Sequence, residues 1–148
     1  MPGQLLGQPH PRKALYYSGH PLQAPQEGLR EHIRCTVGAY TGLDENTALA
    51  VAAGFGGGCR CGEICGAVSG AIMALGMHCP YVDGRDLERK EEIAALSRFL
   101  TGRFREEFGA LRCDEIKGDK AHCPDYIRFM AKLAEDTIIE RNNQKTGE

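Results

Sequence analysis

Apolar residues recur at helical spacing along most of the chain after residue 26. Between residues 27 and 41 they stand three or four positions apart, which predicts a helix that ends before Gly42. Asp44 can cap a second, short helix that runs to Ala53, because its carboxylate can accept hydrogen bonds from the free amides of a helix start. The pattern therefore predicts two consecutive helices in this region.

A glycine-rich segment, residues 54–58, interrupts the pattern before a third helix that is expected over about residues 62–77. Small residues recur every four positions on this helix, at Gly66, Gly70 and Ala74. Such a smooth ridge lets a second backbone approach closely, which offsets the entropic cost of glycine in a helix. The approaching backbone could belong to the same chain or to a second copy in a homodimer.

Two longer helices follow in the second half of the chain. Asp86 can cap a helix that runs to about Gly109, and Pro124 suits the first turn of the last helix. The apolar stripe of the first of these helices comprises Leu87, Ile93, Leu96, Leu100, Phe104 and Phe108. The inner face of the last comprises Ile127, Met130, Ala131, Ala134 and Ile138. With no alternating strand pattern, these elements predict an all-α fold, a compact helical bundle of about four or five helices.

The beginning of the chain differs from the rest. Five of the seven prolines fall within residues 1–26, and prolines at this density cannot lie inside a long helix. We therefore expect residues 1–26 to form an irregular N-terminal segment and residues 27–141 to form a single helical domain that contains the cysteine motif. A chain of 148 residues is long enough to bury a hydrophobic core without disulfide bonds.

Charge and composition exclude several classes of function. The formal net charge is −2, basic residues form no stripe and tryptophan is absent, so nucleic-acid binding is not expected. No apolar run is long enough to insert into a membrane, and the first residues do not resemble a signal peptide. These features predict a cytoplasmic protein, where clustered cysteines indicate metal or redox chemistry more often than structural disulfide bonds.

The seven cysteines carry the clearest chemical signal. Cys61 and Cys65 lie four residues apart at the predicted start of the third helix, so we expect them to share one face. Cys123 directly precedes Pro124 at the start of the last helix. The amides and the dipole of a helix N-terminus favour a thiolate, which predicts low pKa values for Cys65 and Cys123. Cys113 lies in the loop between the last two long helices. It could gather with Cys65 and Cys123 as a third soft ligand.

The other cysteines have weaker signals. Cys35 lies within the first predicted helix, where a small buried hydrophobic residue and a functional thiol are equally plausible. Cys59 and Cys79 have no regular partner spacing, so we expect both to be small buried hydrophobic residues. No C-x-x-C pair is present, which argues against a thioredoxin-type couple and a zinc ribbon. Four gathered thiolates would suit either zinc or an iron–sulfur cluster.

The segment GFGGGCRCGEICGAVSGAIMALG at residues 54–76 resembles the central motif of the C-GCAxxG-C-C family of putative redox-active proteins. The later segments LRCDEIKG and HCPDYI, which carry Cys113 and Cys123, match the two C-terminal cysteines of that family in order and context. The family pattern begins with a further cysteine in an N-terminal helix. Here Ser18-Gly19 is directly followed by His-Pro-Leu-Gln-Ala, with no cysteine. Under the resemblance, either Cys35 takes that role, or Cys61 substitutes for it, or the fourth ligand is lost.

The resemblance implies an all-helical, redox-active protein. The family is also similar to the non-haem part of split-Soret cytochromes, which carry an iron–sulfur cluster. We therefore expect an iron–sulfur protein for electron transfer or redox sensing. Its cofactor and metal ligands would be Cys65, Cys113 and Cys123, with Cys35 or Cys61. The alternatives are a thiol/disulfide redox protein without metal and a structural zinc-binding module. The sequence identifies neither the redox partner nor a catalysed reaction.

Overall fold

The structure is a computed structural model that describes residues 42–116 and 123–147. The predicted irregular segment 1–26 and the predicted helix over residues 27–41 lie outside the described residues. The structure therefore places six of the seven cysteines and does not place Cys35.

The described residues fold mainly into helices, which confirms the all-α prediction. The four longer helices are α4 (Glu45–Ala52), α5 (Gly66–His78), α6 (Leu87–Phe108) and α8 (Cys123–Thr146). A short turn of helix, α7, spans Cys113–Ile116, and an irregular turn, η2, spans Gly58–Gly62. The isolated β-bridge recorded in this part of the chain joins Ile64 to Arg112.

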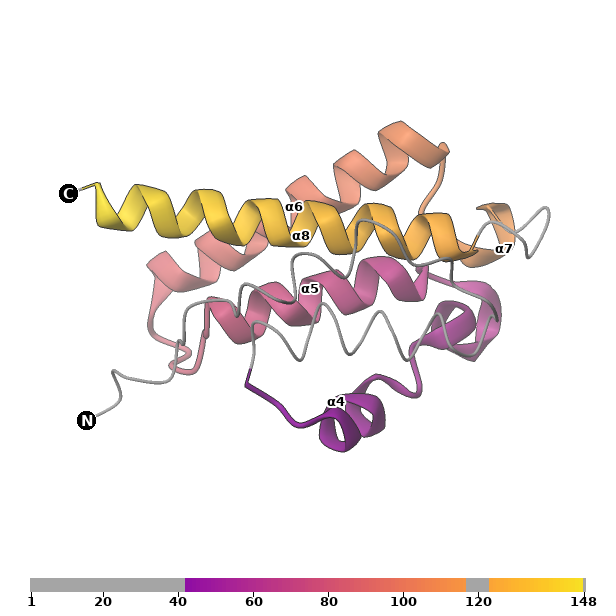
Figure 1. Cartoon of the computed structure of the whole chain (residues 1–148), viewed down its shortest axis with the longest axis horizontal. Helices are drawn as coiled ribbons and strands as arrows, with labels where there is room; N and C mark the ends of the chain where they lie inside the picture. The colour runs from indigo at the N-terminus through magenta and orange to yellow at the C-terminus, as the bar shows by residue number, and fades with distance from the viewer. Residues whose placement is uncertain (1–41, 117–122, 148) are drawn as a thin grey trace.

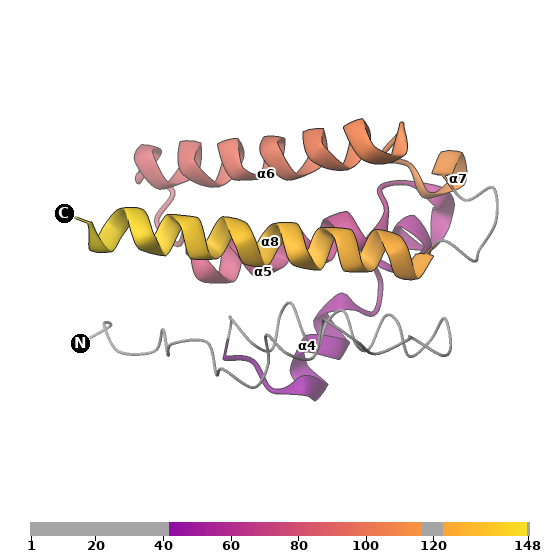
Figure 2. The same cartoon turned by 45° about the horizontal axis from the view of Figure 1, so that its top comes forward.

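Helix α5 lies at the centre of the arrangement. It contacts both α6 and α8, which also contact each other. In both views α4 lies on the opposite side of α5 from α6 (Figures 1 and 2). The turn η2, the short helix α7 and the beginnings of α5 and α8 all lie at one end of this bundle (Figure 2). The elements that carry most of the cysteines therefore meet at one end.

The helix boundaries follow the predicted capping residues. The side chain of Asp44 accepts a hydrogen bond from the amide of Thr47 at 3.0 Å, and that of Asp86 accepts one from the amide of Arg89 at 2.9 Å. Helix α6 ends at Gly109, whose φ of 85° suits a glycine at this position. The predictions for α4 and α6 are thus confirmed to within a residue or two.

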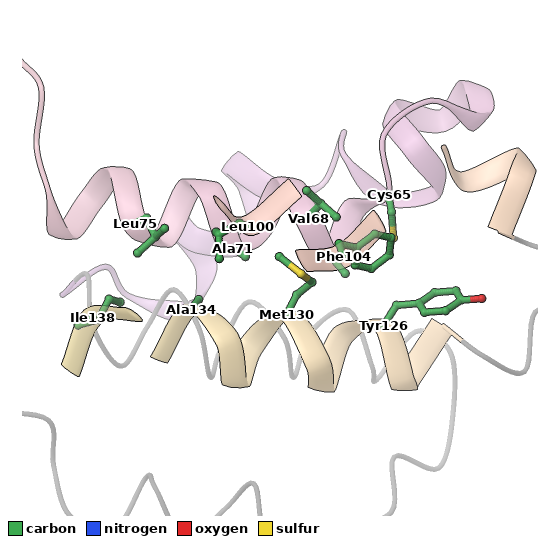
Figure 3. Close-up of a cluster of buried hydrophobic side chains, with 11 residues drawn as sticks. Cys65, Val68, Ala71, Leu75, Leu100, Phe104, Tyr126, Met130, Ala134 and Ile138 are labelled. Carbon is green, nitrogen blue, oxygen red and sulfur yellow. The ribbon is translucent and has the colours of Figure 1, made fainter. Parts of the chain in front are cut away.

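The core forms where α5, α6 and α8 meet, and it spans the length of the bundle. Its fully buried large side chains include Val68, Leu75, Leu100, Phe104, Met130 and Ile138. Cys65, Phe104 and Tyr126 lie toward one end of this core and Leu75 and Ile138 toward the other (Figure 3). The apolar stripe of α6 is confirmed at Leu100 and Phe104, but Leu87 is 70% exposed because it begins the helix at the rim of the bundle.

The small-residue ridge of α5 faces α4 and the segment that follows it. A side-chain carbon added at Gly66 would lie 2.9 Å from the carbonyl oxygen of Phe55. Further along the ridge, Ala74 packs against Ala48 and Ala52 of α4. The ridge thus serves packing within the chain, at least at these two positions. No helix in the described part of the chain combines the length and apolar character needed to cross a membrane.

Candidate redox site

The segment before α5 differs from the prediction. The third helix begins at Gly66 rather than near residue 62, and residues 58–62 form the irregular turn η2. Gly57, Gly58, Cys59 and Arg60 are four consecutive residues in the left-handed region, with φ between 57° and 65°. A right-handed helix cannot continue through such residues. The expectation that Cys61 and Cys65 share a helix face is therefore wrong.

The extended residues between η2 and α5 pair with the segment before α7. The amide of Cys65 donates to the carbonyl of Leu111 at 2.9 Å, and the amide of Cys113 donates to the carbonyl of Glu63 at 2.6 Å. These two bonds flank the bridge between Ile64 and Arg112. The pairing holds the backbones of Cys65 and Cys113 next to each other, although they are far apart in the sequence.

Arg112 reinforces this pairing from the surface. Its Nη1 donates to both carboxylate oxygens of Glu63 at 3.0 Å, and its Nε and Nη2 donate to Asp114 at 3.0 and 2.6 Å. The guanidinium lowers the pKa of the Asp114 carboxyl, mainly through these hydrogen bonds. Each pair is solvent-exposed and weak alone, but the shared arginine links the two paired segments.

A close backbone approach joins η2 to the same site. A side-chain carbon added at Gly58 would lie 2.5 Å from the carbonyl oxygen of Glu63 and 2.8 Å from Cβ of Cys113. The amide of Glu63 also donates to the carbonyl of Gly58 at 2.9 Å. Only glycine fits at this position, which explains part of the glycine run at residues 54–58.

Tyr126 ties the beginning of α8 to this end of the bundle. Its hydroxyl donates to the carbonyl of Ile116, the last residue of α7, at 2.8 Å. Its ring packs edge-on against Phe108, with the ring centroids 4.6 Å apart, and against Phe104 at 5.8 Å. Cys123 begins α8 one turn before Tyr126 and is half-buried.

The three motif cysteines interact electrostatically. Burial raises the pKa of the Cys65 thiol, and the neighbouring Cys113 and Cys123 raise it further. The backbone amides of Ala67 and Val68, at the start of α5, act in the opposite direction but do not prevail. The prediction of a lowered pKa at Cys65 is therefore wrong, because loss of hydration outweighs the helix terminus.

The same thiols act on Tyr126. Burial is the main cause of the raised pKa of its hydroxyl, and Cys123, Cys65, Asp125 and Cys113 raise it further in their ionised forms. Cys65, Cys113, Cys123 and Tyr126 thus form one interacting group, which we call the motif-cysteine site. It draws on the beginning of α5, on α7 and on the beginning of α8.

Of the two remaining predicted ligands, Cys61 lies in the described residues and is not part of this group. Cys61 is exposed, and its thiol donates to the carbonyl of Gly58 at 3.4 Å. Cys35 lies outside the residues that the structure describes. In residues 42–116 and 123–147, no three histidine, cysteine, aspartate or glutamate side chains are arranged to hold a single metal ion.

The two cysteines expected to be buried hydrophobic residues have different surroundings. Cys79 follows α5 at the end of the bundle away from the motif-cysteine site and is 1% exposed, as expected. Cys59 is exposed, so the expectation for it is wrong. Its left-handed backbone belongs to the turn η2, in which Gly58 lies against Cys113. This arrangement leaves the Cys59 side chain in solvent.

Two residues that position the site were not predicted from the sequence. Tyr126 had a local signal, because a residue three positions after Cys123 on a helix lies on nearly the same face. Arg112 had none, because its partner Glu63 is 49 residues away in the sequence. Only the tertiary pairing of the two segments brings those two charges together.

The geometry of the motif-cysteine site agrees with a comparison to protein families. Residues 31–137 match the family model described as a putative redox-active protein, C_GCAxxG_C_C. The chain belongs to this family. The match covers more than half of the chain and includes all three cysteines of the motif-cysteine site. No curated protein and no solved structure matched the chain.

Proposed function

We propose that this family member is an electron-transfer or redox-sensing protein in which Cys65, Cys113 and Cys123 hold an iron–sulfur cluster. The observation that carries the proposal is the convergence of these three thiols from three separate elements at one end of the bundle. An ordinary core has no need to gather three cysteines in one place, whereas a cluster requires it.

The donor chemistry of the motif-cysteine site fits a cluster. Cys65 and Cys113 are buried, and the interactions that act on the Cys65 sulfur come from backbone amides and from two further thiols. Ionising these thiols together would be unfavourable without a compensating positive charge, which the iron atoms of a cluster supply. The amides of Ala67 and Val68 can stabilise the Cys65 thiolate.

In the described residues no three ligands are arranged around a single ion, and a cluster does not require that arrangement. A tetrahedral zinc ion needs its thiolates about 2.3 Å from one centre, which packs the sulfurs tightly. A cluster spreads its thiolates over several iron atoms and accepts wider separations. When bound, a cluster supplies one-electron transfer. The chain itself contributes the Arg112 pairing, which positions Cys65 and Cys113. It also contributes the fully buried ring of Phe104, which lies in the same core cluster as Cys65 and shields this end from water.

An absorption spectrum tests the proposal. Protein purified without oxygen should show broad visible absorption, with iron and sulfide in matching amounts. Cys65→Ser should remove this absorption, whereas Cys79→Ser should retain it. The two cysteines form a matched pair, because both are buried at the ends of the same helix. A colourless, iron-free wild-type protein would overturn the proposal.

A second candidate function is a thiol/disulfide couple among the same cysteines. Two observations favour it. The three thiols interact with one another, and no three ligands in the described residues are arranged around one ion. Cleavage after glutamate separates these thiols into fragments 64–88, 108–115 and 116–135. Oxidation by glutathione disulfide should link two of these fragments in metal-free protein. Fragments that stay unlinked would contradict this candidate.

Zinc remains a third prediction and is tested on the same sample. A structural zinc site would give a colourless protein that retains zinc and loses helicity when a chelator removes it. Zinc below one equivalent per chain, together with helicity unchanged by the chelator, would contradict it.

A further inference from the structure

Cys59 and Cys61 lie outside the motif-cysteine site and differ from the other described cysteines. Both are exposed, whereas Cys65, Cys79 and Cys113 are buried. They stand two residues apart on η2, at either side of Arg60. We propose that Cys59 and Cys61 form a second, exposed dithiol that exchanges with disulfides of an external redox partner.

The geometry of η2 brings the two residues within reach of a disulfide bond. The helical rise and radius put α-carbons two residues apart at about 5.4 Å, and a left-handed turn keeps the same distance. Disulfide-bonded α-carbons are about 4.4–6.8 Å apart. The two side chains leave a helical turn in different directions, so the turn must open for the bond to form. Opening lets Cys59 and Arg60 leave the left-handed region, which is unfavourable for both.

The hydrogen bonds of η2 assign the order of reaction. The Cys61 thiol donates to the carbonyl of Gly58 at 3.4 Å, so its hydrogen is engaged with the backbone of η2. Cys59 is therefore the attacking thiol. Its thiolate bonds to one sulfur of the external disulfide, and the other sulfur leaves as a thiolate. The Cys61 thiolate then attacks the Cys59 sulfur and releases the second partner thiol. The pair gives up two electrons and two protons, and the partner's disulfide is reduced to two thiols.

The position of η2 places this exchange next to the buried thiols. Gly58, directly before Cys59, lies against Cys113, and the backbone of Glu63 bonds to both Gly58 and Cys113. A change in η2 is therefore transmitted to Cys113 through direct contacts. The exposed pair provides a point of contact with partners that the buried thiols themselves lack.

Peptide mapping tests the proposal on the full-length chain. Cleavage after Glu45 and Glu63 releases fragment 46–63, whose two cysteines are Cys59 and Cys61. Reduced protein exposed to glutathione disulfide should yield this fragment with two hydrogen atoms fewer and no site for alkylation. Cys61→Ser should stop at a mixed disulfide with glutathione on Cys59, because the resolving thiol is missing. Cys79→Ser should behave as the wild type.

Two results would overturn the proposal. One is a fragment 46–63 that takes up two alkyl groups at every ratio of glutathione disulfide to glutathione. The other is a disulfide that joins it to fragment 64–88, which carries Cys65 and Cys79. Fragment 46–63 contains none of the three motif cysteines, so this result does not depend on whether a cluster forms. Both thiols are exposed, so serine at either position should leave the fold intact, and circular dichroism checks this.

Discussion

Alanine substitutions at Gly57 and Gly58 would separate backbone strain from the close approach that builds the motif-cysteine site. Both glycines have nearly the same left-handed φ, 62° and 65°. A side-chain carbon at Gly57 would meet nothing within 4 Å, whereas one at Gly58 would lie 2.5 Å from the oxygen of Glu63 and 2.8 Å from Cβ of Cys113. The two variants therefore differ in their contacts and not in their backbone conformation.

The expected magnitudes follow from this difference. A left-handed alanine costs about 1–2 kcal/mol, so Gly57→Ala should lower the free energy of unfolding by about that amount. Gly58→Ala carries the same cost, and overpacking against the backbone adds about 1–3 kcal/mol. Its total cost should be about 2–5 kcal/mol. For a domain of this size, each kcal/mol lowers Tm by about 2–4 °C.

Urea denaturation followed by far-ultraviolet circular dichroism measures both costs. The alkylation rate of Cys113, followed in fragment 108–115, reports on the site itself. Gly58→Ala should speed this alkylation because the added carbon displaces Cys113, and Gly57→Ala should not. Equal costs for the two variants, or equal alkylation rates, would refute the inferred contact between η2 and Cys113.

Three further predictions concern the scaffold. Glu92 is paired with Arg141, which lowers the pKa of its carboxyl from about 4.5 to about 2. The ion pair therefore stabilises the fold fully above the unfolded pKa near 4.5, and this stability is lost as the pH falls toward about 2. Glu92→Gln should remove about 1–3 kcal/mol at neutral pH and flatten the pH profile of urea midpoints between these values; an unchanged profile would argue against the pairing. Phe104→Ala should lower the free energy of unfolding by about 3–5 kcal/mol, measured by calorimetry, because the ring is fully buried. Phe99 lies on the same helix but is 47% exposed, so Phe99→Ala should cost less than about 1 kcal/mol. Asp86→Ala should cost about 1 kcal/mol through loss of the cap on α6, and Asp86→Asn should restore most of it in the same assay; equal costs would contradict the capping role.

Much of the helical scaffold was predictable because its determinants are local. A helix forms through bonds between residues four apart, and its ends depend on one or two side chains. Asp44, Asp86 and Gly109 therefore reveal helix boundaries without knowledge of the fold. The order and context of Cys113 and Cys123 likewise indicate the family, because both are properties of the linear chain.

The turn before α5 was not predictable in the same way. Cys59 and Arg60 carry no signal for a left-handed backbone, and the apolar spacing that follows them suggested a helix that began too early. Tertiary contacts impose this turn, because Gly58 must pass close to Cys113 and Ile64 must pair with Arg112. These contacts separated Cys61 from Cys65 and exposed it.

The sequence by itself determined the all-α class, the main helices and the identity of the three motif cysteines, since each is written in short-range spacing or in residue order. The tertiary structure decided which thiols interact, that burial raises the pKa of Cys65, and that Cys59 and Cys61 face solvent. The physical reason is the same for all three. Electrostatic interaction and loss of hydration depend on distance and burial in space, and segments far apart in the sequence set both at this end of the bundle.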